Sequence, residues 1–233
     1  MILNADMSVR VAVHAATQAW SSSPMAGVER RMLYRVGGEV ARATSIVRYA
    51  PGSTFSPHRH DGGEEFFVID GVFEDEHGDY PAGSYCRNPP GTSHTPGSAV
   101  GCTMLVKLWQ FESHDRTQVK IDALRSSPVA SADRSGVQTI ALFDDAREHV
   151  RLEVWPPGQR IHVDAVGGLE ILVLSGGFEE GGDAFVEMSW LRLPVGSNLQ
   201  AVTGPAGCRV WMKEGHLRHA SDRQPSRPMV DPR

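Results

Sequence analysis

Short runs of apolar and β-branched residues alternate with turn signals along most of the chain. Residues 44–49 contain Ile, Val and Tyr and end at a Pro-Gly pair, and residues 66–69 end at an Asp-Gly pair. Both dipeptides favour tight turns. Strand-length runs with turns every ~8–12 residues are typical of β-sandwiches and barrels. The pattern therefore predicts an all-β fold.

The remaining stretches agree with this prediction. Further strands are expected at residues 10–14, 29–36, 72–74, 84–87 and 102–111. No stretch gives a convincing long amphipathic helix, and residues 142–150 are the nearest candidate. The polar, Ser-rich segment 112–138 indicates a connection between two halves. The polar tail from residue 215, with three prolines, is expected to be loosely held.

The second half of the chain repeats the spacing of the first. A Pro-Gly pair at residues 51–52 recurs at 157–158, and a Gly-Cys pair at 101–102 recurs at 207–208, both 106 residues later. Between these ends the offset is 105, as it is from Gly91 to Gly196. Shared offsets with a one-residue slip predict two tandem copies of one β domain. We expect one at residues 1–118 and the other, with the polar tail, at residues 119–233.

Composition narrows the function classes. The chain has 233 residues, 40% of them hydrophobic, and a formal net charge of −5, as in a globular protein without an electrostatic footprint for nucleic acid or an anionic membrane. Three scattered cysteines without a Cys-x-x-Cys pair argue against a disulfide framework and a cysteine-based zinc finger. The N-terminus carries no basic region followed by a long apolar run, so we expect no signal peptide, no membrane association and a cytoplasmic location.

Three histidines and a carboxylate are spaced as strand-borne metal ligands. His58 and His60 are two residues apart, so on a strand their side chains share one face. Glu64 follows a flexible turn and opens the next strand, and His94 follows a rigid Pro-Pro-Gly turn. Three neutral imidazoles and a carboxylate suit Zn²⁺, Fe²⁺, Mn²⁺, Ni²⁺ or Cu²⁺ better than Ca²⁺ or Mg²⁺. A closed tetrahedral zinc site would be structural or sensory, whereas a higher coordination number would leave room for catalysis.

These residues resemble the two motifs of the cupin superfamily. Gly52, His58, His60, Glu64 and Gly71 fit the first motif, and Gly83, Pro89, Gly91 and His94 fit the second. The resemblance implies two double-stranded β-helix (jelly-roll) barrels in tandem, with one metal held by His58, His60, Glu64 and His94. The second motif usually ends in Asn, where this chain has Ser98. That Asn is not a ligand, so the metal prediction is little affected.

Residues 40–111 are more narrowly similar to the cupin domain of ChrR-type anti-sigma factors. The similarity lies in the stretches 63–66, 70–76 and 79–83. It implies zinc as the first choice of metal, with iron, nickel or manganese as alternatives, and a role in transcription regulation. The family's sigma-factor partner is held by an N-terminal helical zinc domain with paired cysteines. Here no cysteine precedes Cys86 and the N-terminus reads as strands, so sigma-factor binding does not carry over.

The second half lacks the histidines at both candidate offsets. At an offset of 106, the positions equivalent to the four candidate ligands hold Asp164, Val166, Glu170 and Gln200. At an offset of 105, they hold Val163, Ala165, Leu169 and Leu199. The second copy is therefore predicted to be metal-free. His162 stands alone and reads as an ordinary strand histidine.

Several other residues are candidates for the site, and most of them are predicted to pack in the core. Cys86 could approach the metal, but all three cysteines are expected in the core. Phe66 and Phe73 could line the barrel mouth, but core packing is the simpler interpretation. The two histidines of the tail could bind a metal together, but a solvated tail is the simpler interpretation. We expect the following cysteines and tryptophans in the core: Cys102, Cys208, Trp109, Trp155, Trp190 and Trp211. We expect His216 and His219 in a solvated tail.

Three functions remain open, in descending order of preference. The first is a zinc-dependent sensory or regulatory protein whose site responds to a small molecule or oxidant. The second is a non-haem iron dioxygenase on a small diketone or aromatic substrate, for which no catalytic residue is assigned and Glu65 is a weak acid–base candidate. The third is a non-catalytic binding module. Cupin barrels commonly pair through their sheets, so the resemblance also implies a homodimer.

Overall fold

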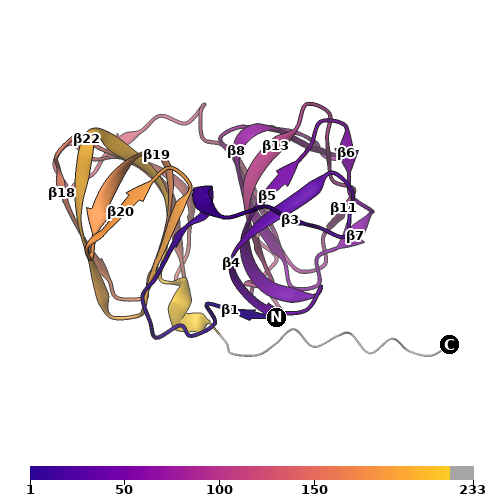
Figure 1. Cartoon of the computed structure of the whole chain (residues 1–233), viewed down its shortest axis with the longest axis horizontal. Coiled ribbons are helices and arrows are strands. Elements are labelled where there is room, and N and C mark those ends of the chain that lie inside the picture. The colour runs from indigo at the N-terminus through magenta and orange to yellow at the C-terminus, as the bar shows by residue number, and fades with distance from the viewer. Residues whose placement is uncertain (221–233) are drawn as a thin grey trace. The chain divides into compact units, whose positions relative to one another are not determined.

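The computed structural model describes residues 1–220, which form two compact units of β structure (Figure 1). Among these residues, unit 1 comprises Met1–Ala5 and Ser21–Lys120, and unit 2 comprises Asp6–Trp20 and Ile121–Ala220. The only helical turns described are two 3₁₀ segments, η1 (Ala15–Thr17) and η2 (His216–His219). The predicted all-β fold is confirmed. No described helix is long and apolar enough to cross a membrane.

Unit 1 is built on one large antiparallel sheet. Its main path runs through β1 (Ile2–Leu3), β4 (Val28–Gly37), β5 (Ala41–Tyr49), β13 (Cys102–Leu108), β8 (Glu64–Asp75), β10 (Ser84–Asn88) and β14 (Val119–Asp122). Short strands branch from this path, namely β3 (Ser21–Ser22), β6 (Ser53–Thr54), β9 (Gly78–Pro81) and β12 (Gly97–Ser98). A separate ladder joins β7 (His58–Arg59) to β11 (Ser93–His94).

Unit 2 has the same kind of antiparallel architecture. Its main path runs through β15 (Val129–Ala130), β16 (Gln138–Asp144), β17 (His149–Trp155), β22 (Ser197–Glu214), β19 (Leu169–Glu180), β21 (Ser189–Leu193) and β2 (Val11–His14). Two further strands are β18 (Arg160–Ala165) and β20 (Asp183–Val186). The weak helix candidate at 142–150 is instead the end of β16, a turn and the start of β17. Its apolar positions alternate across a sheet rather than following a helical face.

The two units repeat one β-bulge. In unit 1, Ile69 has no partner between the β8–β13 pairs of Asp70 and Val68, and in unit 2 Leu174 is left over in the same way between β19 and β22. Ile69 and Leu174 are 105 residues apart, as the sequence repeat predicts. The bulged strand in each unit thus bends at the same repeat position.

Each unit encloses its own apolar core. In unit 1 the core gathers Phe66, Val68, Phe73, Tyr80 and Met104 among others, and in unit 2 it is centred on Trp155, Ile171, Phe178 and Leu199. All three cysteines are buried and free, so their predicted packing role is confirmed.

The second strand of the chain, β2, contributes to unit 2, although β1 before it belongs to unit 1. The predicted strand at residues 10–14 forms as β2, but it pairs with β21 at the edge of the unit 2 sheet. Arg10 also holds Glu180 and Asp183 through ion pairs of 2.8 Å each. The predicted division at residue 118 places this segment in the first domain. Strand pairing between distant parts of the chain leaves no local signal, which explains the difference.

The beginning of the predicted loose tail is ordered. Leu217 is buried, and His216 on η2 lies 3.1 Å through Nε2 from Glu170 Oε1 in the interior of unit 2. The prediction of a solvated His216 is therefore wrong, because a short apolar anchor, Leu217, holds the turn against the barrel. Residues 221–233 of the predicted tail lie outside the described residues.

Candidate metal centre

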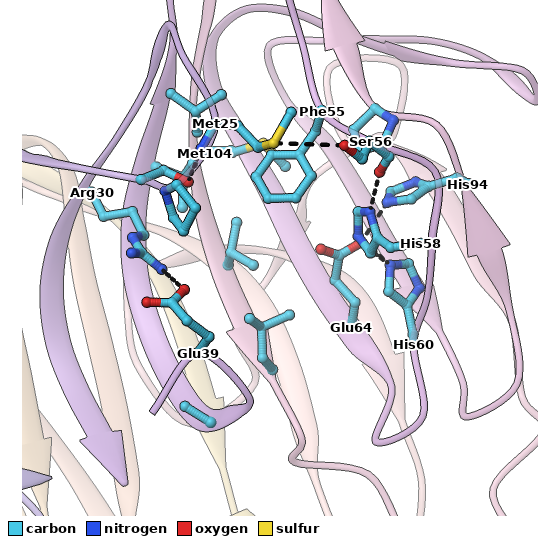
Figure 2. Close-up of a pocket in the computed structure, with 18 of the residues that line it drawn as sticks. Met25, Arg30, Glu39, Phe55, Ser56, His58, His60, Glu64, His94 and Met104 are labelled. Carbon is cyan, nitrogen blue, oxygen red and sulfur yellow. Dashed lines mark hydrogen bonds and ion pairs between the residues drawn. The ribbon is translucent and has the colours of Figure 1, made fainter. Parts of the chain in front are cut away.

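The four predicted ligands meet at one point in unit 1 (Figure 2). The β7–β11 ladder sets His58 directly opposite His94. His60 follows β7, and Glu64 is the first residue of β8, as expected. Two short strands and the start of a long one therefore bring together residues up to 36 positions apart in the sequence.

The imidazoles face one another across a space of ion size. His58, His60 and His94 offer ring nitrogens that all lie within 4.8 Å of one another. The Nε2 atoms of His58 and His60 are 3.3 Å apart. Glu64 Oε2 lies 3.5 Å from His60 Nε2 and 3.6 Å from His94 Nε2. The three ring nitrogens thus surround a single volume, and the Glu64 oxygen lies beside two of them. Nitrogen and carboxylate donors of this kind are those that a transition-metal ion prefers.

Hydrogen bonds on the far side of each ring fix its tautomer. His58 Nδ1 donates to the Ser56 carbonyl oxygen at 2.9 Å, and His94 Nδ1 donates to the Asp75 carboxylate at 3.0 Å. His60 Nδ1 lies 3.1 Å from Thr92 Oγ1, whose own proton goes to the Pro89 carbonyl. Because each Nδ1 carries the proton, each Nε2 presents a lone pair to the centre.

Burial makes this convergence costly without a cation. His94 is 3% exposed, His60 6% and Glu64 8%. His94 Nε2 and Glu64 Oε2 are fully buried and have no hydrogen-bond partner among the described residues. Lone pairs and a carboxylate facing one another in a dry space repel and lack solvation. The residues present therefore fit a divalent metal ion.

The same burial favours the neutral form of His60 and His94 by lowering the pKa of each. Removal from water, assisted by the neighbouring His58, lowers the pKa of His60 to about 4. Burial also lowers the pKa of His94, partly opposed by the Glu64 carboxylate. Neutral imidazole is the form that binds metal, so the two ligands are ready at neutral pH.

Sequence reasoning missed Asp75, which orients His94. Its carboxylate is buried, with a side-chain exposure of 2%, and it also accepts hydrogen bonds from Tyr80 Oη at 3.2 Å and the His77 amide at 2.8 Å. Asp75 lies two residues beyond Phe73 on β8, so both side chains take the inward face. The only sequence signal for Asp75 was its position two residues after Phe73, on the same face of the strand. That signal is hard to notice because residues 74–76 are all acidic.

An apolar cavity of about 540 Å³ adjoins the four candidate ligands. Its walls are mainly hydrophobic, including Met25, Val47, Phe55, Met104 and Val106. Phe73 lines it as well, and the Phe73 ring lies 5.8 Å from the His94 ring. Trp109 was expected in the core but is only half-buried and lines this cavity. Its ring fits there because Gly62 has no side chain, since a Cβ at Gly62 would lie 2.2 Å from the ring.

The other residues weighed for this site lie elsewhere. Glu65 points to the opposite face of β8 and accepts a hydrogen bond from Tyr85 Oη at 2.7 Å, so it does not face the candidate ligands. Cys86 packs in the apolar core of unit 1, and Phe66 does so too. Trp155, Trp190 and Trp211 are fully buried, as predicted.

Unit 2 replaces each candidate ligand by an apolar residue. The pair Val163–Leu199 occupies the register position of His58–His94, and Leu169 opposite Leu193 occupies that of Glu64 opposite Asn88. The offset of 105 is therefore the structural one here. The four equivalents all belong to the unit 2 core, and they are Val163, Ala165, Leu169 and Leu199. His162 points outward to Asp164 at 2.9 Å, an ordinary strand histidine as predicted.

The comparisons with known proteins agree with this geometry. Residues 8–112 match the family model of the ChrR cupin-like domain. The matched region is therefore a cupin-like domain of the cupin superfamily. No curated protein sequence matches the chain.

Solved structures of similar fold extend over both units of the cupin protein. A candidate dioxygenase from Nostoc punctiforme is 14% identical, with a TM-score of 0.67 over 98% of this chain and 87% of its own. Ylba from E. coli is 14% identical, with a TM-score of 0.68 over 91% and 93%. The bacterial pirin YhhW from Escherichia coli, solved with nickel(II), is 12% identical, with a TM-score of 0.64 over 88% and 98%. At these identities the likeness shows a shared fold.

Proposed function

We propose that unit 1 is a metal-dependent sensory or regulatory cupin that binds one zinc ion through His58, His60, Glu64 and His94. The observation that carries the proposal is the set of Nδ1 hydrogen bonds, which turns three Nε2 lone pairs toward one shared space, with the unpartnered Glu64 oxygen beside two of them. Such an arrangement gains free energy from a bound cation and is unfavourable when empty.

Zinc is the preferred ion because three imidazoles and one carboxylate complete a tetrahedral set. The similarity of residues 8–112 to ChrR cupin-like domains supports the same choice and a regulatory role. In this role a small molecule or oxidant enters the adjoining cavity and changes the coordination of the ion. The chain's residues hold the ion, keep water out through the apolar walls and admit the effector from the cavity side.

A second candidate function is a non-haem metal-dependent dioxygenase. The observation that favours it is the 540 Å³ apolar cavity beside the ligands, which is large enough for a small organic substrate. The likeness to a candidate dioxygenase is compatible with this function, and the nickel-bound pirin shows that this fold accommodates other transition metals. Bound iron would supply oxygen chemistry, while His94, oriented by Asp75, would help to hold it.

Elemental analysis of protein purified without chelators tests the site. We expect about one metal ion per chain in the wild type and less than about a tenth of that in the His58→Ala/His60→Ala double variant. His162→Ala is the matched control, because this histidine also lies on a strand but is exposed in unit 2. Equal metal content in the double variant would disprove the assignment.

The identity of the ion and turnover separate the two functions. Tightly held zinc without oxygen consumption on small diketones or aromatic substrates supports the regulatory role. Iron with oxygen uptake that is lost in the double variant supports the dioxygenase instead.

A further inference from the structure

A second polar feature lies in the cavity, away from the histidines. Arg30 is on β4, two residues after Val28, so both side chains take the inward face and both line the cavity. Figure 2 shows Arg30 on the side of the cavity opposite His58, His60 and His94.

The charge of Arg30 is only weakly compensated. Its counter-ion among the described residues is Glu39, whose Oε2 lies 3.9 Å from Arg30 Nη1 and whose side chain is 72% exposed. The Arg30 side chain itself is 18% exposed. Its Nε is buried and has no hydrogen-bond partner among the described residues. Because the Nε atom is covered, only the terminal Nη groups, whose contact with Glu39 is long, remain as N–H donors for an anionic oxygen.

The outward arginine of the neighbouring strand behaves differently. Arg48 on β5 has a side-chain exposure of 44% and forms a surface ion pair with Glu29, the residue before Arg30. The sheet thus pairs its outward arginine with a carboxylate from the same surface. Arg30, on the cavity face, has no carboxylate of residues 1–220 within good hydrogen-bond range.

The space between Arg30 and the histidines is apolar. Val47, Phe55, Met104 and Val106 contribute to its walls, and Figure 2 shows Met25, Phe55 and Met104 between the two polar ends. An occupant that leaves an apolar group against Arg30 would bury an uncompensated charge. An occupant without an apolar body would leave the walls poorly filled. The cavity therefore favours a molecule with an apolar middle and an acid at one end.

We propose that the cavity binds a small monocarboxylic acid with an aliphatic or aromatic body, its carboxylate paired with Arg30. A carboxylate that meets the two terminal Nη groups can accept two parallel hydrogen bonds, which Arg provides and Lys does not. The opposite end of the molecule then points to His58, His60 and His94. This inference rests on the proposed metal centre only for what that opposite end meets.

Calorimetric titration of the full metal-loaded chain with a matched pair of probes tests the inference. The probes are 4-phenylbutyrate and its neutral analogue 4-phenylbutyramide, which share the apolar body and differ in charge. We expect the acid to bind the wild type at least about tenfold more tightly than the amide. In Arg30→Gln the preference should fall below about threefold while amide binding is kept. Arg48→Gln is the control and should retain the full preference.

The outcomes separate this inference from the metal proposal. The His58→Ala/His60→Ala variant should keep the preference for the acid, because Arg30 is intact. If the preference is lost in that variant but survives in Arg30→Gln, the carboxylate binds the metal and the inference is wrong. If the preference depends on Arg30 but no metal is bound by the wild type, the metal proposal fails and the inference stands. The inference would also be wrong if neither probe binds the wild-type protein.

Discussion

At the scale of single residues, the far-side hydrogen bonds are as important as the ligands themselves. Asp75 is the only charged partner among them, and its buried carboxylate holds His94 Nδ1 at 3.0 Å. A carboxylate on the other ring nitrogen fixes the ring and raises its basicity toward a metal. The affinity of the centre should therefore depend on a residue that never touches the ion.

Asp75→Asn should weaken metal binding about 10-fold to 100-fold, because the amide keeps a hydrogen-bond acceptor but removes the charge. Competition with a chelator of known affinity measures the change. Asp79→Asn is the control, since Asp79 is exposed on the neighbouring strand β9. An equal loss in both variants would mean that net charge, rather than the hydrogen bond, is responsible.

The lowered pKa of His60 predicts an acid-sensitive metal-free protein. Burial brings the pKa of His60 to about 4, whereas an unfolded histidine titrates near ~6.5. Between these values the unfolded state binds more protons, so stability is present above about pH 6.5 and is lost as the pH falls toward about 4. Urea unfolding of metal-free protein across this range should show a larger decrease for the wild type than for His60→Gln, by about 2 kcal/mol.

The exposed His162 provides the control for this titration. His162→Gln should follow the wild-type pH curve, because this histidine has a side-chain exposure of 57% in unit 2. A wild-type curve that coincides with that of His60→Gln would contradict the prediction.

At the scale of elements, the bulge on β8 and its equivalent on β19 depend on glycine. Gly71 has φ +75°, and a Cβ there would lie 2.0 Å from the Gly101 carbonyl oxygen. Gly176 has φ +70°, and its Cβ would lie 2.1 Å from the Gly207 carbonyl oxygen. Both obstacles are backbone atoms, which cannot rotate away. The close strand contact at the bulge is therefore reserved for glycine in both units.

Gly71→Ala should lower the free energy of unfolding by more than about 2 kcal/mol, since it adds a backbone clash to the left-handed strain. Gly52→Ala should cost only about 1 kcal/mol, because Gly52 has φ +74° but open space around its Cβ position. Denaturant unfolding measures both values. Equal costs would mean that the conformational strain alone matters and that the strands can separate at the bulge.

At the scale of the whole molecule, the two units differ in the residues that occupy the candidate ligand positions and their equivalents. In unit 1 it holds three imidazoles and a carboxylate beside a cavity, and in unit 2 it holds four core residues. The second barrel thus gains hydrophobic stabilisation where the first would gain it from a bound ion.

Metal should consequently protect unit 1 alone. At a free zinc concentration of 100 times the dissociation constant, the stabilisation is about 2.7 kcal/mol, or about 100-fold slower exchange of amides that open globally. Hydrogen-exchange mass spectrometry should show this slowing in β8 and β13, and no change in β19 and β22. Equal protection of both sets of strands would contradict a metal effect confined to unit 1.

The sequence by itself determined the repeated all-β fold and the four converging residues of unit 1. Strand alternation, turn dipeptides and the spacing of His58, His60, Glu64 and His94 are local signals, and each reflects a local backbone requirement. The lack of a histidine pair in the second copy is also visible in the sequence, because neither offset supplies one.

Only the tertiary structure decided the features that depend on distant partners. The transfer of β2 to unit 2, the burial of His216 and the choice of offset 105 rest on strand pairing and packing across long separations. The same holds for Asp75 behind His94 and for Arg30 across the cavity, which are single charged residues in polar stretches. A sequence shows which side chains are present, but the register of paired strands decides which of them face one another.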